Sequence, residues 1–384
     1  MIIKRIMEKE LERIASLFAV AVVTGPRQSG KTTLCKQVFK DYHYVDIEDI
    51  SIREQIMAAP KNFLLQYRQG LIIDEVQRYP ELFSYIKTVV DEFPESHIVL
   101  TGSSNFALMA NITESLAGRA ATLTLLPLSL AELGKRGQTN TDTILLNGGY
   151  PAVWGRNIPV LDVSRNYYNT YIERDVRQLL NVKDIIKFQT FIKLCAGRIG
   201  TEWNAVSLSN EIGVSVHTIN EWLSVLEASY ILFRLPPFFR NIGKRLVKTP
   251  KVYFYDTGLV CFLLGIENEQ ELATHPLRGA IFENMIILEF FKNRYNEGKL
   301  PNLYFYRDKS QNEVDLIEEQ GTKIYAYEIK SAKAFTKGFV SGLDYLRKIA
   351  GKHVISTYVI YDGENDIYSP ENGIVNFRNI QFNN

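Results

Sequence analysis

The chain has 384 residues, which is enough for two or three domains that each bury a core of their own, and which excludes a single small binding module. With 46% hydrophobic and 23% charged residues, the composition excludes disordered, collagen-like and coiled-coil chains. The net charge of +1 excludes a global positive field of the kind that binds nucleic acid without a dedicated patch.

The cysteines and the apolar runs indicate the compartment. Cys35, Cys195 and Cys261 are isolated in the sequence, which argues against a disulfide framework and against a Cys-x-x-Cys metal or redox site. The apolar run at residues 17–23 is too short for a signal peptide or a membrane span. We therefore expect a soluble cytoplasmic protein without a membrane partner.

The pattern of apolar residues predicts an α/β protein in three parts. Residues 1–148 alternate short apolar runs with amphipathic segments, which is typical of a parallel sheet covered by helices. Helical spacing of Tyr and Leu follows to about residue 205, then a basic, turn-rich stretch to about 255, and a last αβ region from about 277. We place the domains at 1–148, 149–258 and 259–384. The strands expected in the first domain lie at residues 17–23, 42–47, 71–74, 98–101 and 121–126.

The strongest motif is GPRQSGKT at residues 25–32, which fits G-x-x-x-x-G-K-[ST] between a predicted strand and a predicted helix. Its glycines let backbone N–H groups point at phosphate oxygens, and the start of the helix adds its positive dipole end. Lys31 would reach the β and γ phosphates, and Thr32 would ligate Mg²⁺. The expected cofactors are ATP and Mg²⁺. The residues expected to bind them are Gly25, Pro26, Arg27, Gln28, Ser29, Gly30, Lys31, Thr32 and Thr33.

An acidic pair follows the third predicted strand. Residues 71–75, LIIDE, end in two acids at the carboxyl edge of the sheet, where open α/β sheets bind ligands. Asp74 is expected to hold the Mg²⁺ shell, and Glu75 to polarise the attacking water in phosphoryl transfer. Such a strand end is common on its own, but together with the phosphate loop it predicts a hydrolysis site.

Two further residues are candidates for the same reaction. Asn105 follows the next strand and could contact the γ-phosphate or its water, or could cap the following helix together with Ser103 and Ser104. Arg119 is a candidate arginine finger that acts in cis or, in an oligomer, from a neighbouring subunit; the alternative is an ordinary surface arginine. The sequence leaves both pairs of alternatives open.

Four segments, GPRQSGKTTL, LIIDEVQRYPELF, VLTGSSNFAL and AGRAATLTLLPLSLAEL, together resemble the prokaryotic AAA-type P-loop ATPases that carry a C-terminal domain of unknown function. The resemblance continues through YYNTYIERDVRQLL, KRLVKTPKVYFYDTGL, GAIFENMIILEF, NEVDLI and YEIKSAK, so it covers nearly the whole chain. It implies ATP binding and an AAA-like P-loop fold, and it leaves the biological role open.

The middle of the chain predicts a helix-turn-helix. Residues 207–219 have a short helix, a turn at Gly213 and a second helix that continues to about 226. The second helix contains Glu221 and Glu227 but neither Lys nor Arg, which weakens a role in reading DNA, because phosphate and base contacts come mostly from basic or amide side chains.

A basic stretch follows, like a wing after the helix-turn-helix. Residues 228–255 contain no acid and alternate basic with aromatic side chains, which can grip a single strand or a duplex backbone. Residues 234–251 are therefore a candidate contact for DNA. The alternative is that the aromatics belong to the core and the cations pair with acids elsewhere. The cations are Arg234, Arg240, Lys244, Arg245, Lys248 and Lys251.

The last region contains acids that are expected to converge. Glu283 shares a helix face with apolar residues and should have a cation or a donor beside it, since an unpaired buried carboxylate is costly. Strand alternation puts Glu313 and Asp315 on one face, and Glu328 beside Lys330 on another strand. The set Glu283, Asp315, Glu328 and Lys330 resembles the PD-(D/E)XK nuclease pattern, which implies a restriction-endonuclease-like domain with a second metal site. The alternative is a nuclease-like scaffold with paired charges and no turnover.

Two hypotheses for the function follow. In both, Lys31, Thr32, Asp74 and Glu75 carry ATP hydrolysis. In the first, ATP controls a nuclease that acts on DNA, as the converging acids and the basic stretch indicate. In the second, the chain is an ATP-controlled regulatory switch whose C-terminal half binds a protein or DNA without cutting, as the acidic second helix and the near-zero net charge indicate.

Overall fold

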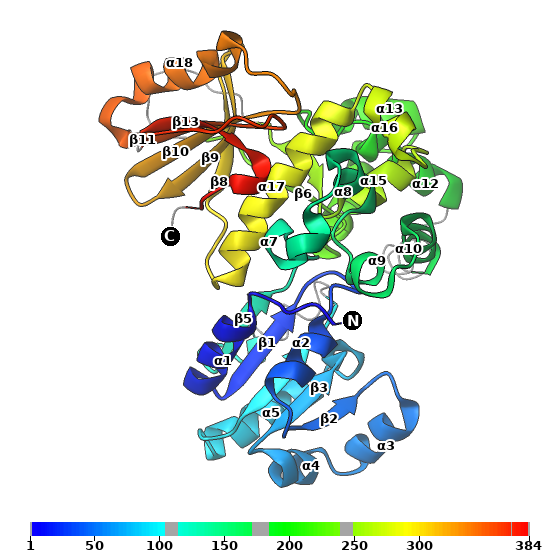
Figure 1. Cartoon of the computed structure of the whole chain (residues 1–384). Coiled ribbons are helices and arrows are strands. Elements are labelled where there is room, and N and C mark those ends of the chain that lie inside the picture. The colour runs from blue at the N-terminus through cyan, green and yellow to red at the C-terminus, as the bar shows by residue number, and fades with distance from the viewer. Residues whose placement is uncertain (1, 104–113, 171–183, 239–248, 370, 383–384) are drawn as a thin grey trace.

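The computed structural model describes residues 2–103, 114–170, 184–238, 249–369 and 371–382. Figure 1 shows a sheet domain at the bottom, with a helical region and a second sheet side by side above it. None of the helices in these ranges is long and apolar enough to cross a membrane.

The first domain contains the predicted parallel sheet. Its strand order is β2-β3-β4-β1-β5, and every neighbouring pair is parallel. All residues of β1, β3 and β4 are buried, as expected of strands covered on both faces. The strands are β1 (Val20–Thr24), β2 (His43–Asp46), β3 (Leu71–Asp74), β4 (Ile98–Thr101) and β5 (Ala120–Thr124).

Helices cover both faces of this sheet. Alternate residues of β1 face opposite cores: Val22 packs with α3, α4 and α5, and Val23 packs with α1 and α2. The prediction of a strand from residue 17 is wrong at its start, because Leu17 ends α1, whose apolar side packs under the sheet. The helices are α1 (Glu8–Leu17), α2 (Lys31–Val38), α3 (Ile50–Ala58), α4 (Pro60–Tyr67) and α5 (Leu82–Glu92).

The middle region is mainly helical and ends in a hairpin. Gly213 takes a left-handed conformation (φ +71°) between α13 and α14, and the antiparallel pair β6 and β7 follows. The elements are α7 (Leu130–Leu133), α8 (Thr141–Asn147), α9 (Pro151–Arg156), α10 (Val160–Tyr167), α12 (Ile185–Ala196), α13 (Ala205–Ile212), α14 (Val216–Ala228), β6 (Leu232–Leu235), β7 (Lys251–Phe254), α15 (Thr257–Leu263) and α16 (Glu269–Thr274).

The last part is a mixed sheet of order β12-β13-β11-β10-β9-β8. Helix α17 packs on one face, and α18 packs on the other through Leu343 and Leu346. One continuous apolar cluster runs from Leu126 through the middle helices and α17 to Phe377, so the middle region and this sheet share a core. The elements are α17 (Arg278–Asn296), β8 (Leu303–Arg307), β9 (Glu313–Gln320), β10 (Lys323–Lys330), α18 (Ser341–Ala350), β11 (Val354–Tyr361), β12 (Ile367–Tyr368) and β13 (Asn372–Asn376).

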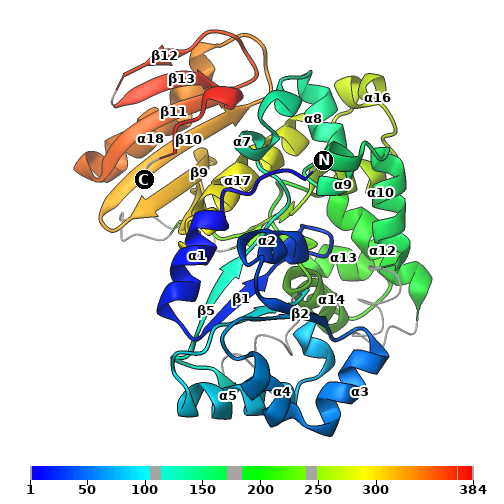
Figure 2. The ribbon, with the colours of Figure 1, turned by 60° about the horizontal axis from the view of Figure 1, so that its bottom comes forward.

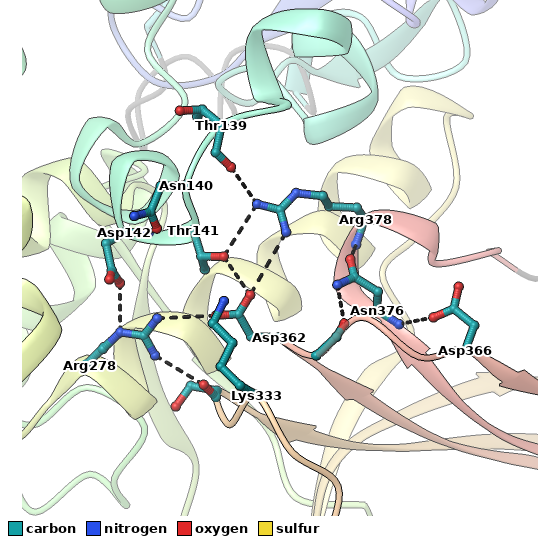
Figure 3. Close-up of polar contacts among 12 residues, drawn as sticks. Thr139, Asn140, Thr141, Asp142, Arg278, Lys333, Asp362, Asp366, Asn376 and Arg378 are labelled. Atoms are coloured by element: carbon teal, nitrogen blue, oxygen red, sulfur yellow. Dashed lines mark hydrogen bonds and ion pairs between the residues drawn. The ribbon is translucent and has the colours of Figure 1, made fainter.

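A polar network fastens the two regions together around the buried carboxylate of Asp362, just after β11 (Figure 3). Thr141 Oγ1 at the start of α8 donates to Asp362 Oδ1 at 2.6 Å. Lys333 Nζ lies 2.8 Å and Arg278 Nη2 lies 3.3 Å from Asp362 Oδ2. Arg278 also holds Asp142 through an Nε–Oδ1 bond of 2.7 Å. The network therefore connects α8, α17 and the end of the second sheet.

We expect Asp362→Asn to destabilise the chain, because it removes a fully buried carboxylate that accepts a hydrogen bond from Thr141 and pairs with Arg278 and Lys333. The free energy of unfolding should fall by about 2 kcal/mol, the usual effect of losing a hydrogen bond to a buried charged group. Thermal melting of the full chain measures it. The control is Asp162→Asn, an exposed i,i+3 partner of Arg165, which should cost at most about 0.5 kcal/mol. Equal melting temperatures for the two variants would contradict the role of Asp362.

Candidate functional site

The loop between β1 and α2 takes the backbone shape that its glycines allow. Gly25 has φ +136°, and a Cβ at this position would lie 2.2 Å from the carbonyl oxygen of Leu125, so a side chain there would collide with the chain after β5. Gly30 has φ +97° and is the N-cap of α2. Gln28 is also left-handed, at φ +63°. The loop thus curls in front of the first turn of α2.

Lys31 lies at the centre of this loop and is 5% exposed. Its Nζ donates to the carbonyl oxygens of Gly25 at 3.1 Å and Pro26 at 2.9 Å. Burial lowers the pKa of Lys31 to about 8, although the nearby carboxylates of Glu75 and Asp74 favour its charged form. The ammonium is therefore held over the loop by the loop's own carbonyl groups.

The carboxylate of Asp74 accepts hydrogen bonds from three hydroxyl groups. Thr32 Oγ1 donates to Asp74 Oδ2 at 2.6 Å, Tyr44 OH donates to the same oxygen at 3.0 Å, and the hydroxyl of Thr101 donates to Oδ1. Burial raises the pKa of Tyr44, and the charge of Asp74 raises it further. Sequence reasoning missed Tyr44 and Thr101. They lie in β2 and β4, the neighbours of β3, and only the strand order reveals that neighbourhood.

Glu75 follows with a left-handed backbone, at φ +51°. Its Oε2 accepts hydrogen bonds from the side chains of Gln77 and Ser103, the latter at 3.2 Å. Such a conformation costs about 1 kcal/mol in a non-glycine residue, and strain of this kind gathers at functional sites. Ser103, a candidate helix cap from the sequence, thus contacts the second acid of the pair. Gln77 is an addition that the sequence pattern did not indicate.

A cavity of about 660 Å³ opens in front of the loop. The phosphate-loop residues 27–33 and Glu75 line one side of it. The other side is made by Ile2 and Ile3 of the N-terminal segment and by residues of α9 and α10. Figure 2 shows the N-terminal segment running from α1 toward α9. The volume lies in the range of pockets that bind small molecules and cofactors.

A buried arginine supports the loop from behind. Arg5 donates from Nη1 to the carbonyl oxygen of Ser29 at 2.7 Å, from Nη2 to that of Leu126 at 2.7 Å, and from Nε to Glu132 Oε1 at 2.9 Å. Glu132 also forms a capping box with Ser129 at the start of α7. Sequence reasoning did not find Arg5, because a single arginine outside any motif carries no signal of such a position.

The other two candidates for the first site have different outcomes. Asn105 lies outside the described residues. Arg119 precedes β5 next to Val20, at the edge of the sheet opposite to the phosphate loop, which follows Thr24. Its guanidinium forms an ion pair with Asp91 of α5. The alternative that Arg119 acts in cis is therefore wrong, because parallel strands β1 and β5 separate it from the loop by their full length.

The C-terminal candidates do lie close together. Lys330 Nζ is 2.9 Å from Asp315 Oδ2 and 2.7 Å from Glu328 Oε2. Glu283 has the cation and the donor that we expected: Lys251 Nζ lies 3.4 Å from its Oε1, and Tyr253 OH donates to the same oxygen. Within the described residues, however, no group of three or more acidic, His or Cys side chains is arranged to hold a metal ion.

The basic stretch 234–251 divides into different environments. Residues 239–248, with Arg240, Lys244, Arg245 and Lys248, lie outside the described residues. Arg234 pairs with Glu227 at 2.7 Å. Lys251 is 3% exposed, so its assignment to a DNA-contacting surface is wrong. Its register opposite Leu235 in the hairpin turns its side chain toward the acids of α17 and β9.

The acids beside Lys330 differ in their proton affinity. Burial raises the pKa of Glu328 to about 9, and the charge of Asp315 adds to the effect. Burial acts in the same direction on Asp315, but Lys330 and Lys251 outweigh it and keep the pKa of Asp315 low. Glu328 is thus the acid of this pair that holds a proton at neutral pH.

This difference predicts a pH dependence of stability. A raised folded-state pKa means that the contribution of Glu328 is fully present below its unfolded pKa near 4.5 and is lost as the pH rises toward about 9. Glu328→Gln should remove that part of the dependence, so its melting temperature relative to wild type should be higher at pH 8.5 than at pH 5. Melting curves across this range measure the effect, with Glu364→Gln at an exposed position as the control. A difference that does not change with pH would contradict the assignment.

Residues 18–134 match the model of an AAA domain, residues 138–270 match a domain of unknown function (DUF8612), and residues 278–380 match another (DUF4143). The chain is 31% identical over 326 residues to the Uncharacterized protein Rv2008c of Mycobacterium tuberculosis. The aligned region covers 83% of this chain and 72% of that protein. It is 24% identical over 391 residues to an uncharacterized protein of Haemophilus influenzae, with 91% and 92% covered.

Among solved structures, the Walker-type ATPase paby2304 of Pyrococcus abyssi is similar, with a TM-score of 0.40, 15% identity, and 67% of this chain and 94% of that chain covered. The parallel sheet and the matched family model define the first part of the chain as an AAA-type P-loop domain. The chain belongs to the family of AAA-domain proteins that includes the mycobacterial relative.

Proposed function

We propose that this protein is a cytoplasmic, Mg²⁺-dependent ATPase that uses its nucleotide state to control its middle and C-terminal regions. The observation that carries the proposal is the cavity of about 660 Å³, which has the phosphate loop on one side and α9 and α10 on the other. A nucleotide in this cavity touches both regions at once, so its γ-phosphate changes the contacts between them.

The phosphate end is made by the loop. Backbone N–H groups of residues 27–32 and the start of α2 bind the phosphates, and Lys31 exchanges the carbonyls of Gly25 and Pro26 for phosphate oxygens. The Thr32 hydroxyl and the Asp74 carboxylate are oxygen donors of the kind that Mg²⁺ prefers, which fits the ion. When bound there, Mg²⁺ supplies charge neutralisation of the phosphates.

The hydrolytic water is oriented by Glu75. Ser103 and Gln77 hold one oxygen of this carboxylate, which fixes its direction and leaves the other oxygen for the water. Asn105 is proposed beside it as a contact of the γ-phosphate. Arg119 acts, if at all, from a neighbouring subunit, and oligomerisation is then part of the mechanism.

The base end is made by apolar side chains. Ile2, Ile3 and Val163 line the cavity, and Arg156 and Asn166 add polar side chains. This combination of apolar side chains with a few polar groups suits an aromatic base. Because α9 and α10 supply much of this lining, base binding draws the middle region onto the AAA domain.

A chain of hydrogen bonds supports the coupling. Arg5 connects the carbonyl of Ser29 with Glu132, and the next residues reach α17: the N–H of Leu130 donates to Glu289 Oε2 at 2.8 Å, and Lys292 Nζ donates to the carbonyl of Leu128 at 2.8 Å. A movement of the phosphate loop therefore bears on the helix that packs against the second sheet.

The output of the switch is proposed to be a protein partner bound without cleavage. Helices α13 and α14 with the β6–β7 hairpin have the order of a winged helix-turn-helix, but α14 lacks basic side chains. Apolar side chains lie exposed beside them: Ile186 is 75% and Val206 57% exposed. Such residues suit a protein surface better than phosphates.

The second candidate function is an ATP-controlled nuclease that acts on DNA. The closeness of Asp315, Glu328 and Lys330, together with the sheet that carries them, favours it. Its test is cleavage of plasmid or single-stranded DNA in the presence of Mg²⁺ or Mn²⁺. Cleavage that disappears in Lys330→Ala would support a nuclease; phosphate release without any cleavage would support the switch.

The ATPase proposal predicts different effects for two substitutions. Lys31→Ala should abolish ATP binding, because the loop then lacks its only buried cation among the described residues. Glu75→Gln should bind ATP normally and hydrolyse it about 100-fold more slowly, since general-base assistance contributes that much or more. Calorimetry with ATP and phosphate release measure the two steps. Normal turnover in Glu75→Gln would remove this residue from the mechanism.

The proposal also predicts how ATP affinity changes with pH. Phosphates bind the charged form of Lys31, whose pKa is about 8 in the free protein, so affinity should be constant below that pH and fall by up to about tenfold per pH unit above it. Lys31→Arg is the matched control, because its guanidinium stays charged; its affinity should not follow this decline. Calorimetric titrations between pH 7 and 9.5 measure both. A wild-type affinity independent of pH would contradict contact between Lys31 and the phosphates.

A further inference from the structure

The side chain of Lys251 belongs to the middle region but contacts acidic side chains of the C-terminal region. Lys251 begins β7 of the middle region, while its partners lie on α17 and β9. Its Nζ lies 2.5 Å from Glu313 Oε1 and 3.4 Å from Glu283 Oε1. We name Glu283, Glu313, Asp315 and Glu328 the carboxylate cluster. Lys251 thus places a positive charge inside the carboxylate cluster.

The position of this ammonium is fixed from several directions. In the hairpin, the backbone of Lys251 pairs with that of Leu235. On its other side, an isolated antiparallel β-bridge joins the backbone of Lys251 to that of Glu202. The ring of Phe305 lies below the ammonium, with its centroid 5.3 Å from Nζ. Tyr253, two residues along the same strand, binds Glu283 through its hydroxyl. These contacts together hold the Lys251 side chain in a single conformation.

The charges of the carboxylate cluster need such a partner. Buried carboxylates without a cation cost several kcal/mol each, and proteins neutralise them with a basic side chain or with a metal ion. Here Lys251 contacts Glu283 and Glu313, and Lys330 contacts the charged Asp315 and the protonated Glu328. Arg307 Nε lies 3.5 Å from the other oxygen of Glu313. Each of the four acids therefore has an ammonium in direct contact, and the field of Lys251 extends to Asp315 as well.

We propose that the ammonium of Lys251 is a built-in replacement for a divalent cation in the carboxylate cluster. The native chain does not take up a divalent cation there, and removal of this ammonium converts the cluster into a metal site of oxygen ligands. The same ammonium joins the β6–β7 hairpin to α17 and β9, so the middle region and the second sheet move as one body. This inference is independent of the nucleotide site, because none of its residues lines that cavity.

The experiment counts Mn²⁺ ions bound to the full chain without nucleotide, by the electron paramagnetic resonance signal of free Mn²⁺. Wild type and Asp315→Asn should bind Mn²⁺ equally. Lys251→Ala should bind one additional ion per chain, at least tenfold more tightly than any binding in wild type. Asp315→Asn introduced into Lys251→Ala should remove this additional ion. Lys251→Arg is the matched control; it keeps a cation in place and should bind as wild type does.

Two results would overturn the proposal. One is a Mn²⁺ ion on wild type that Asp315→Asn removes, since the native cluster would then be a metal site. The other is a folded Lys251→Ala chain that gains no ion. Folding is checked by a cooperative melting transition and by unchanged ATP binding, which also separates a failure of this proposal from a failure of the proposed ATPase function.

The loss of Lys251 can itself prevent folding, because it leaves the half-buried Glu283 without its cation and Glu313 with Arg307 alone. The proposal then predicts that Mn²⁺ restores the cooperative melting transition of Lys251→Ala, and that Asp315→Asn in the same chain abolishes the rescue. A Lys251→Ala chain that stays unfolded in Mn²⁺ contradicts the proposal, as does a rescue that persists in the Asp315→Asn background.

Discussion

The guanidinium of Arg5 holds three separate parts of the chain in one place. It binds the phosphate loop at Ser29, the end of the first sheet at Leu126, and the start of the helical region at Glu132, and its side chain is almost completely buried. A buried charge that loses its partners costs several kcal/mol, so none of the three parts can move away without the others. The shape of the loop, and therefore the cavity in front of it, depends on this one residue before the motif begins.

Helix α17 extends that constraint to the far end of the molecule. Its 19 residues span about 28 Å at 1.5 Å per residue. Glu289 and Lys292 form hydrogen bonds with the backbone of residues 128–130, close to Arg5. Further along the helix, Glu283 forms an ion pair with Lys251. At the start of the helix, Arg278 forms an ion pair with Asp362. Because a helix transmits displacement along its axis, a shift at one end of α17 changes contacts at the other. The regulatory hypothesis thus has a physical basis in one rigid element that several buried ion pairs hold.

Charge balance decides what the C-terminal region can do. The acids that resemble a nuclease pattern are the ones that Lys251 and Lys330 contact. An oxygen-rich cluster with an internal cation gains little from a metal ion, since the repulsion between its acids is already relieved. In the proposed switch, the C-terminal region is in this way a rigid scaffold, and the AAA domain controls a binding surface.

The sequence by itself determined the parts that depend on neighbours along the chain. The phosphate loop, the apolar strands β3 and β4, the acids that follow β3 and the turn at Gly213 could be predicted because their chemistry is local: glycines permit positive φ, and apolar runs form buried strands. The same holds for the expectation that Glu283 needs a cation. Only the tertiary structure decided which cation Glu283 receives and that Tyr44 and Thr101 contact Asp74. It alone also decided the distance of Arg119 from the loop and the position of Arg5. These contacts join residues that are far apart in the chain, and their partners follow from strand order and helix packing, which no single segment of the sequence contains.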